Sequence, residues 1–128
     1  MERLLWVCLG GAVGSGARYL ASLLAARWLG AAFGYGTLFV NVLGSLLLGA
    51  IVSIAKARGL VGSTLYFALA AGVMGGFTTY SSFNNETLAY LDGGLPGRAA
   101  WNVGLTLVLC LAAGFVGLRA GTWVGTPR

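Results

Sequence analysis

The sequence contains no histidine and few charged residues of any kind. Only 9% of its 128 residues are charged, whereas a soluble domain has about 25%. At 58% hydrophobic residues, a chain of this length could not bury its apolar surface in water. The composition therefore excludes a soluble fold and predicts an integral membrane protein.

Residues that carry catalysis or bind transition metals are equally scarce. The acidic residues Glu2, Glu86 and Asp92 are far apart in the sequence, and the two cysteines lie in separate apolar runs. We find no nucleophile–base pair and no metal-ligand cluster, so we do not expect an enzyme. We expect Cys8 and Cys110 to be small core residues rather than a disulfide or a metal site.

The net charge of +5 comes from basic residues scattered between the apolar runs. A nucleic-acid patch would cluster them, so we expect no nucleic-acid partner. Basic residues at such positions typically anchor helices in membrane lipid, at the headgroups, and set the topology.

Four long apolar regions predict four transmembrane helices in one domain covering residues 1–128. They lie at about residues 4–28, 37–55, 62–91 and 99–118, and a spanning helix needs about 20 residues. Strands of a membrane barrel would alternate over about 10 residues, and these regions do not. The N-terminal stretch MERLLWVCLGGAVGSGA is similar to a signal peptide, with one basic residue, an apolar core and small residues at its end. Because the apolar pattern resumes with YLASLLAARWL, we expect a retained first helix.

The third apolar region is too long for one straight membrane helix. Thirty residues of helix would reach about 45 Å, against a hydrocarbon core of about 30 Å. Its centre reads GVMGGFTTYSSFNNE, and the glycines and threonines there predict a break near residues 75–79. Carbonyls freed by such a break can bind ions. The alternative is a tilted, continuous helix whose glycines permit close packing.

Several polar residues inside the apolar regions need a partner or a water-filled cavity. We expect Arg18 to face a cavity and attract an anion, with snorkelling to the interface as the alternative. Asn41 is either a donor on a pore wall or part of an interhelical hydrogen bond. Two stripes at i, i+4 spacing suggest a hydrophilic track, namely Thr37 and Asn41 in the second region and Asn102, Thr106 and Cys110 in the fourth.

Tyr80 and Phe83 are three residues apart and share one side of a helix. The edge of an aromatic ring is electropositive, so the pair can face a dehydrated anion in a narrow pore, although such pairs often serve only packing. Glu86 follows one turn later. We expect it to orient donors or pair with a cation rather than act as a catalytic acid.

Three motifs together resemble the Fluc (CrcB) family of fluoride channels. They are GGAVGSGARY, GTLFVNVLGSLLLG and GVMGGFTTYSSFNNETL, in the first three apolar regions. The resemblance implies passive, fluoride-selective efflux across the cell inner (plasma) membrane by an antiparallel, dual-topology dimer of four-helix subunits with two pores. It implies a structural sodium ion at the dimer interface, bound by the backbone carbonyls of Gly75 and Thr78. The motif positions place Asn41, Tyr80, Phe83 and Thr106 in the fluoride pore, with Arg18, Thr37, Ser81, Glu86 and Asn102 in supporting positions.

The sequence departs from the family pattern at three positions. Tyr80 stands where the family usually has Phe, Ser82 where it has Thr, and Cys110 where serine is expected. The phenol adds a polar tip beside the implied pore, so we expect this chain to differ from its relatives in how it handles fluoride there.

The distribution of positive charge bears on the partner. The N-terminal side is expected to hold Arg3, Lys56, Arg58, Arg119 and Arg128, against Arg27 and Arg98 on the other side. This bias favours a cytoplasmic N-terminus. The partner is therefore either a second copy in an antiparallel homodimer or an oppositely oriented paralogue.

Two other functions remain open at this stage. A small four-helix proton-coupled multidrug exporter needs a carboxylate embedded in its first helix, where this chain has Arg18. A packing subunit without transport would use the 22 glycines for close helix contacts, but it leaves Arg18 and Asn41 without an explanation.

Overall fold

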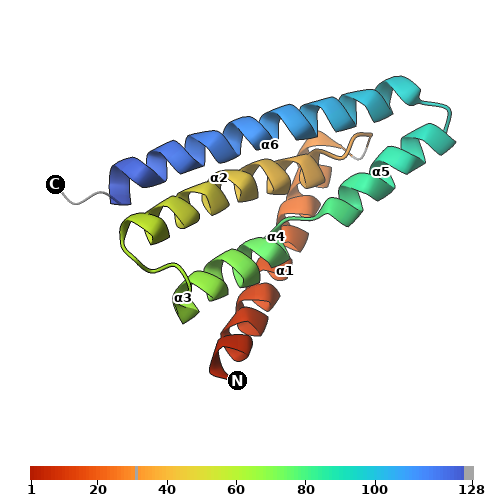
Figure 1. Ribbon diagram of the computed structural model, residues 1–128. Helices are drawn as coiled ribbons and strands as arrows, with labels where there is room; N and C mark the ends of the chain where they lie inside the picture. Colours follow the sequence, from red (N-terminus) through yellow and green to blue (C-terminus); the bar gives the residue numbers. More distant parts are fainter. Residues whose placement is uncertain (31, 126–128) are drawn as a thin grey trace.

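The computed structural model describes residues 1–30 and 32–125, and all regular structure within them is helical. Four helical segments follow one another, and the third is divided into shorter pieces (Figure 1). The continuous helices are α1 (Glu2–Leu29), α2 (Tyr35–Ala57) and α6 (Pro96–Gly125). The third segment consists of α3 (Thr64–Phe67), the π-helix η1 (Ala68–Met74), α4 (Gly75–Phe77) and α5 (Tyr80–Asp92).

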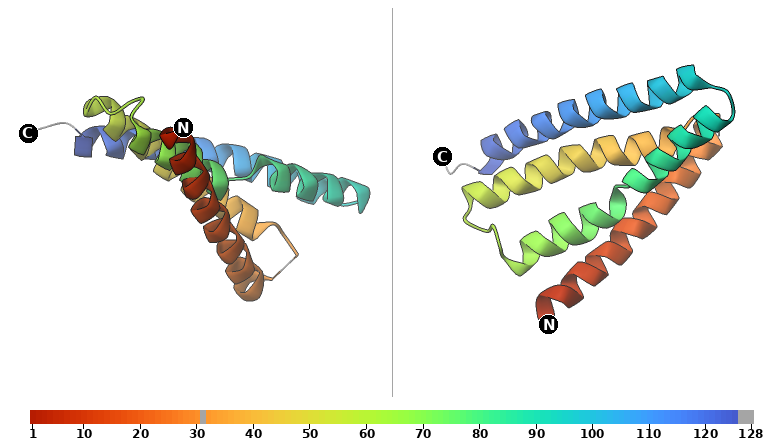
Figure 2. Two further views of the ribbon diagram at one scale, coloured as in Figure 1. Left: turned by 90° about the horizontal axis from the view of Figure 1, so that it is seen from below. Right: turned by 45° about the vertical axis from the view of Figure 1, so that its right-hand side comes forward.

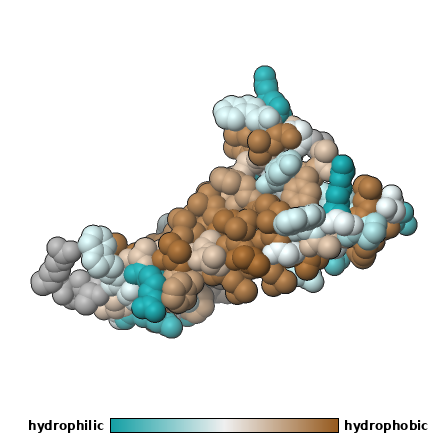
Figure 3. Space-filling model, turned by 90° about the horizontal axis from the view of Figure 1, so that it is seen from above, coloured by the Kyte–Doolittle hydropathy of each residue, from teal (hydrophilic) through white to brown (hydrophobic). Residues whose placement is uncertain are grey.

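Three helices, α1, α2 and α6, are long and apolar enough to cross a membrane by length and composition. The 23 residues of α2 reach about 34 Å, slightly more than a hydrocarbon core of about 30 Å. Figure 3 shows hydrophobic surface over the middle of the molecule and hydrophilic residues mainly toward its ends. This all-helical arrangement agrees with the all-α membrane fold expected from the sequence, and the antiparallel dimer stays a prediction.

The fourth helix is longer than we predicted. The apolar pattern suggested a span ending near residue 118 and a short tail, but α6 continues to Gly125. Its last turns pack on α2, because a Cβ on Gly121 would lie 2.6 Å from the Ala50 carbonyl oxygen and one on Gly125 would lie 2.8 Å from the Ala57 Cβ. Packing on α2, visible in Figures 1 and 2, therefore extends the helix past Arg119. Arg128 lies outside the described residues.

Helix α1 crosses the third segment at close range (Figure 2). A Cβ on Gly10 would lie 2.5 Å from the Ala68 carbonyl oxygen, and one on Gly14 would overlap the Val73 carbonyl oxygen. Backbones can approach this closely only where side chains are missing. A small core lies beside the crossing, formed by Val40, Met74 and Phe77.

The chain leaves the helical conformation at two residues of the third segment. Thr78 (φ −84°, ψ 158°) and Thr79 (φ −152°, ψ 115°) are extended, whereas Gly75–Phe77 forms α4. The Thr79 hydroxyl caps α5 by accepting a hydrogen bond from the Ser82 N–H at 3.1 Å. The non-helical residues are thus fewer than the predicted range 75–79, because the glycine pair remains helical.

The cysteines do not both lie in a core. Cys110 is partly buried, but Cys8 is exposed on α1. Our expectation for Cys8 was therefore wrong. Apolar surroundings in the sequence did not distinguish the α1 face that packs on η1 from the face that no other part of the described chain covers.

Candidate functional site

A groove with a volume of about 430 Å³ lies between α2, α6 and the interruption of the third segment. It brings together all four residues that we placed in the fluoride pore, Asn41, Tyr80, Phe83 and Thr106. Its remaining polar lining comes from Ser45, Thr78, Thr79 and Cys110. Residues from separate helices therefore line one continuous surface.

Asn41 binds the extended backbone directly. Its Oδ1 accepts a hydrogen bond from the Thr79 N–H at 2.8 Å, and its Nδ2 donates to the Thr79 carbonyl at 3.0 Å. Both residues are buried, at 9% and 7% exposure. Asn41 thus makes the hydrogen bonds between segments that were one alternative, and its side chain also lines the groove. Its role as a donor on a pore wall stays a prediction.

The interruption removes the usual helical donors from carbonyl groups at the end of α4, those of Gly75 and Thr78 among them. In a continuous helix the Gly75 carbonyl would accept from the Thr79 N–H, and the Thr78 carbonyl from the Ser82 N–H. Here the Thr79 N–H donates to Asn41 and the Ser82 N–H donates to the Thr79 hydroxyl. Both carbonyls therefore need other partners, as carbonyls at a helix end do.

The aromatic pair of α5 lies at the open side of the groove. The ring centroids of Tyr80 and Phe83 are 5.7 Å apart with the planes tilted by 55°. Tyr80 is 76% exposed, and Gly75 and Ser81 are exposed as well. The part of the chain that the structure describes therefore leaves one side of the groove uncovered.

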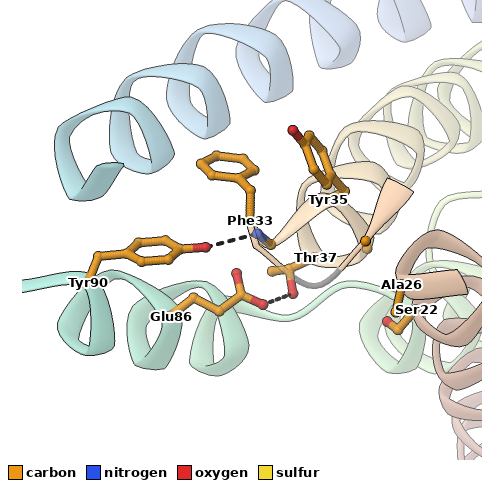
Figure 4. A pocket seen from close by; sticks show the side chains of 10 residues that line it. Ser22, Ala26, Phe33, Tyr35, Thr37, Glu86 and Tyr90 are labelled. Atoms are coloured by element: carbon orange, nitrogen blue, oxygen red, sulfur yellow. Dashed lines mark hydrogen bonds between the residues drawn. The ribbon is translucent and has the colours of Figure 1, made fainter. Parts of the chain in front are cut away.

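Glu86 lies in a separate cavity of about 220 Å³ near the start of α2 (Figure 4). Its Oε1 accepts a hydrogen bond from the Thr37 hydroxyl at 2.5 Å, while its buried Oε2 has no hydrogen-bond partner among the described residues. Gly34 leaves room for Oε2, since a Cβ there would overlap it. The Tyr90 hydroxyl accepts from the Gly34 N–H at 2.9 Å. Glu86 thus accepts a hydrogen bond from Thr37, and its role in orienting donors or pairing with a cation stays a prediction.

The structure divides each of the two predicted polar stripes, so that the members of one stripe do not all line the same space. Thr37 lines the Glu86 cavity and Asn41 lines the groove, so the two residues do not share one pathway wall. Asn102 is only 1% exposed and lines neither space. Its Nδ2 donates to the Thr87 hydroxyl at 2.9 Å and the Phe83 carbonyl at 3.4 Å. Asn102 therefore joins α6 to α5 through these two hydrogen bonds.

Arg18 lines neither the groove nor the Glu86 cavity. It is partly buried on α1 and makes no hydrogen bond or ion pair among the described residues. Neither of these two spaces therefore supports the expectation that Arg18 faces a cavity, which stays a prediction.

Sequence reasoning missed Thr79 and Tyr90. A threonine just before a helix start is a recognised N-cap signal, so Thr79 was within reach. Nothing in the local sequence indicates that Tyr90 contacts the loop between α1 and α2.

Comparison with known proteins shows which family the chain belongs to. Residues 5–118 match the family described as CrcB-like protein, Camphor Resistance (CrcB). The chain belongs to this family. Three curated relatives, each named fluoride-specific ion channel FluC, share about half of its residues. The protein of Sorangium cellulosum is 52% identical over 118 residues, covering 92% of this chain and 93% of its own length.

The other two relatives show the same extent of similarity. The protein of Anaeromyxobacter dehalogenans is 52% identical over 124 residues, covering 97% of this CrcB chain and 98% of its own. That of Thermus thermophilus is 48% identical over 121 residues, covering 94% and 96%. Together with the three apolar helices, this membership makes the chain a multi-pass membrane protein. The relatives are named as channels, in agreement with our expectation that the chain is not an enzyme.

Proposed function

We propose that this CrcB chain is a fluoride-selective ion channel that lets fluoride leave the cytoplasm passively and so relieves fluoride toxicity. The observation that carries the proposal is the similarity, over more than nine tenths of the chain, to proteins named as fluoride-specific channels. The groove supports it, since the residues placed in the pore by motif position line one surface. The membrane would be the inner (plasma) membrane, where such efflux lowers the cytoplasmic concentration.

In the proposed pathway fluoride sheds most of its water and passes along the groove. An amide NH₂ has two hydrogens, and Asn41 uses one of them for the Thr79 carbonyl, which leaves the other for an anion. The ring edges of Tyr80 and Phe83 and the Thr106 hydroxyl supply further electropositive contacts. A passive pathway needs contacts of this moderate strength, because an ion must leave as readily as it enters.

We further propose a structural sodium ion on the Gly75 and Thr78 carbonyls. The two groups fit such an ion, because both have lost their helical donors and hard cations take oxygen ligands. The ion would offset negative charge beside the groove. Thr78 Oγ1 is directed elsewhere, since it donates to the Met74 carbonyl at 2.9 Å.

The partner in this proposal is a second, antiparallel chain that covers the open side of the groove. Tyr80, Ser81 and Asn84 are exposed on α5, and polar groups at membrane depth are normally buried in protein or face a cavity. The second chain is a copy of this one or an oppositely oriented paralogue. No observation favours the proton-coupled multidrug exporter.

The proposal is tested with the purified chain alone, reconstituted in a sodium-containing buffer into liposomes loaded with potassium fluoride or potassium chloride. We expect rapid fluoride efflux, measured with a fluoride electrode after a potassium ionophore is added, and at least a hundredfold slower chloride efflux. Equal rates for the two anions would refute selectivity. No fluoride efflux from a correctly folded chain would refute the homodimeric channel, and rescue by a paralogue would identify the alternative partner.

The sodium site has a test of its own. Liposomes prepared with N-methylglucamine in place of sodium should lose fluoride efflux, because the bulky organic cation cannot bind two backbone carbonyls. Unchanged flux in protein shown to be free of sodium would contradict the proposed ion.

A further inference from the structure

A third hollow lies at the opposite end of α2 from the Glu86 cavity. It is a crevice of about 240 Å³ between the last turns of α2, the loop that follows and the start of the third segment. Its apolar lining includes Ile51, Ile54, Leu60, Leu65 and Leu69, and Arg58 lines it as well. None of these residues belongs to the groove or to the Glu86 cavity.

The position of this crevice relates it to the membrane boundary. Arg58 is the C-cap of α2, where the apolar part of the helix ends and the loop begins. Tyr66 also lines the crevice, and tyrosines are enriched at the level of the lipid headgroups. The apolar lining therefore extends from the headgroup level toward the hydrocarbon core.

The charge around the crevice is positive. Arg3 lies at the same end, because its guanidinium stacks over the Phe67 ring of α3 at 4.9 Å. Lys56 lies in the last turn of α2, and Arg58 is its C-cap. The sequence has three acidic residues, and only Glu2 lies at this end. Glu86 is bonded to Thr37 at the other end of α2, and Asp92 ends α5 beyond it.

We propose that this crevice binds one anionic phospholipid, with an acyl chain along the apolar lining and the phosphate on the Arg58 guanidinium. Arginine matches phosphate geometry with paired donors. A basic surface at a membrane boundary attracts anionic lipids, and the apolar lining gives an acyl chain a defined place. The inference goes beyond the proposed channel function and does not depend on it.

A second copy of the chain fits the crevice less well. A parallel copy would bring the same basic end against Arg58. An antiparallel copy would bring the end that carries Arg27 and Arg98 with Asp92, which is not an anionic surface. Charge complementarity therefore favours a lipid phosphate.

The proposal is tested by native mass spectrometry of the purified, delipidated chain titrated with phosphatidylglycerol or with phosphatidylcholine of the same acyl chains. For the wild type we expect retention of the anionic lipid to exceed that of the neutral lipid several-fold. Arg58→Gln should reduce phosphatidylglycerol retention to the phosphatidylcholine level. Lys56→Gln and Arg27→Gln remove the same charge outside the crevice. Lys56→Gln, at the same basic end, should lower retention less than Arg58→Gln does, and Arg27→Gln, at the other end, should leave the preference intact.

A second variant tests the apolar part of the crevice. Leu69→Trp, with Arg58 unchanged, should also lower phosphatidylglycerol retention, because the larger ring fills the space for the acyl chain. The melting temperature without lipid shows whether each variant is folded. If Leu69→Trp does not fold, the comparison of Arg58→Gln with Lys56→Gln decides the proposal by itself. Unchanged retention in Arg58→Gln, or an equal loss in Lys56→Gln, would overturn the proposal. Dissociation of a dimer by Leu69→Trp without loss of lipid would assign the crevice to a second copy.

Discussion

At the scale of single residues, Asn41 links α2 to the extended backbone of the third segment. A buried N–H and a buried carbonyl at Thr79 are both satisfied by this one side chain. An unpaired buried polar group costs about 1–3 kcal/mol. Asn41 is therefore needed to stabilise the interruption that turns the Gly75 and Thr78 carbonyls away from helical partners.

We expect Asn41→Leu to lower the free energy of unfolding by about 2 kcal/mol or more, since it leaves both Thr79 groups unpaired. It should also abolish fluoride efflux. Thermal unfolding of the purified protein and the liposome assay measure the two effects. Ser45→Ala is the matched control, because Ser45 lines the same groove but its hydroxyl donates to the Asn41 carbonyl and not to Thr79. Equal melting temperatures for wild type and Asn41→Leu would contradict this role.

Thr37 holds Glu86 by the hydrogen bond at 2.5 Å. Thr37→Val keeps the shape of the side chain but leaves a second carboxyl oxygen without a partner, so we expect a loss of about 1–3 kcal/mol. Thr37→Ser retains the hydroxyl and should stay close to the wild type. Melting temperatures of the two variants give the comparison, and similar losses in both would mean that the methyl group, not the hydrogen bond, is important.

At the scale of elements, glycines decide how closely the helices approach. On α1, Gly14 faces the Val73 carbonyl and the Phe77 N–H, whereas Gly16 has open space around it. The same helix thus offers one glycine that packing requires and another that it does not.

We expect Gly14→Ala to destabilise the protein by about 1–3 kcal/mol through overpacking against backbone atoms that cannot move away. Gly16→Ala should be neutral or slightly stabilising, since alanine is the better helix former. Chemical or thermal unfolding of both variants measures the difference. A Gly16→Ala loss as large as that of Gly14→Ala would indicate that a partner chain covers the Gly16 face.

At the scale of the whole molecule, the second chain that we propose to cover the exposed polar face of α5 has an orientation that can be tested directly. Gly97 at the start of α6 has open space around it, so Gly97→Cys in a background with Cys8 and Cys110 replaced by alanine gives one labelling site. An antiparallel homodimer predicts that an impermeant maleimide labels about half of the chains in intact cells. Labelling of all or none would show a single orientation and favour an oppositely oriented paralogue.

Composition and local pattern were sufficient for several conclusions. The near absence of charge required a membrane environment, and apolar length predicted α1 and α2, because each helix must satisfy its own backbone in lipid. The glycine and threonine run in the third region predicted where a continuous helix would be disfavoured. Motif positions selected Asn41, Tyr80, Phe83 and Thr106, which the structure brings to one groove.

Only the tertiary structure decided which polar groups meet. Spacing placed Thr37 with Asn41 and Asn102 with Thr106, yet Thr37 faces Glu86 and Asn102 faces Thr87. The hydropathy pattern ended the last helix near residue 118, whereas packing on α2 extends it to Gly125. Periodicity defines the faces of one helix, but the partner of each face depends on how helices distant in sequence cross.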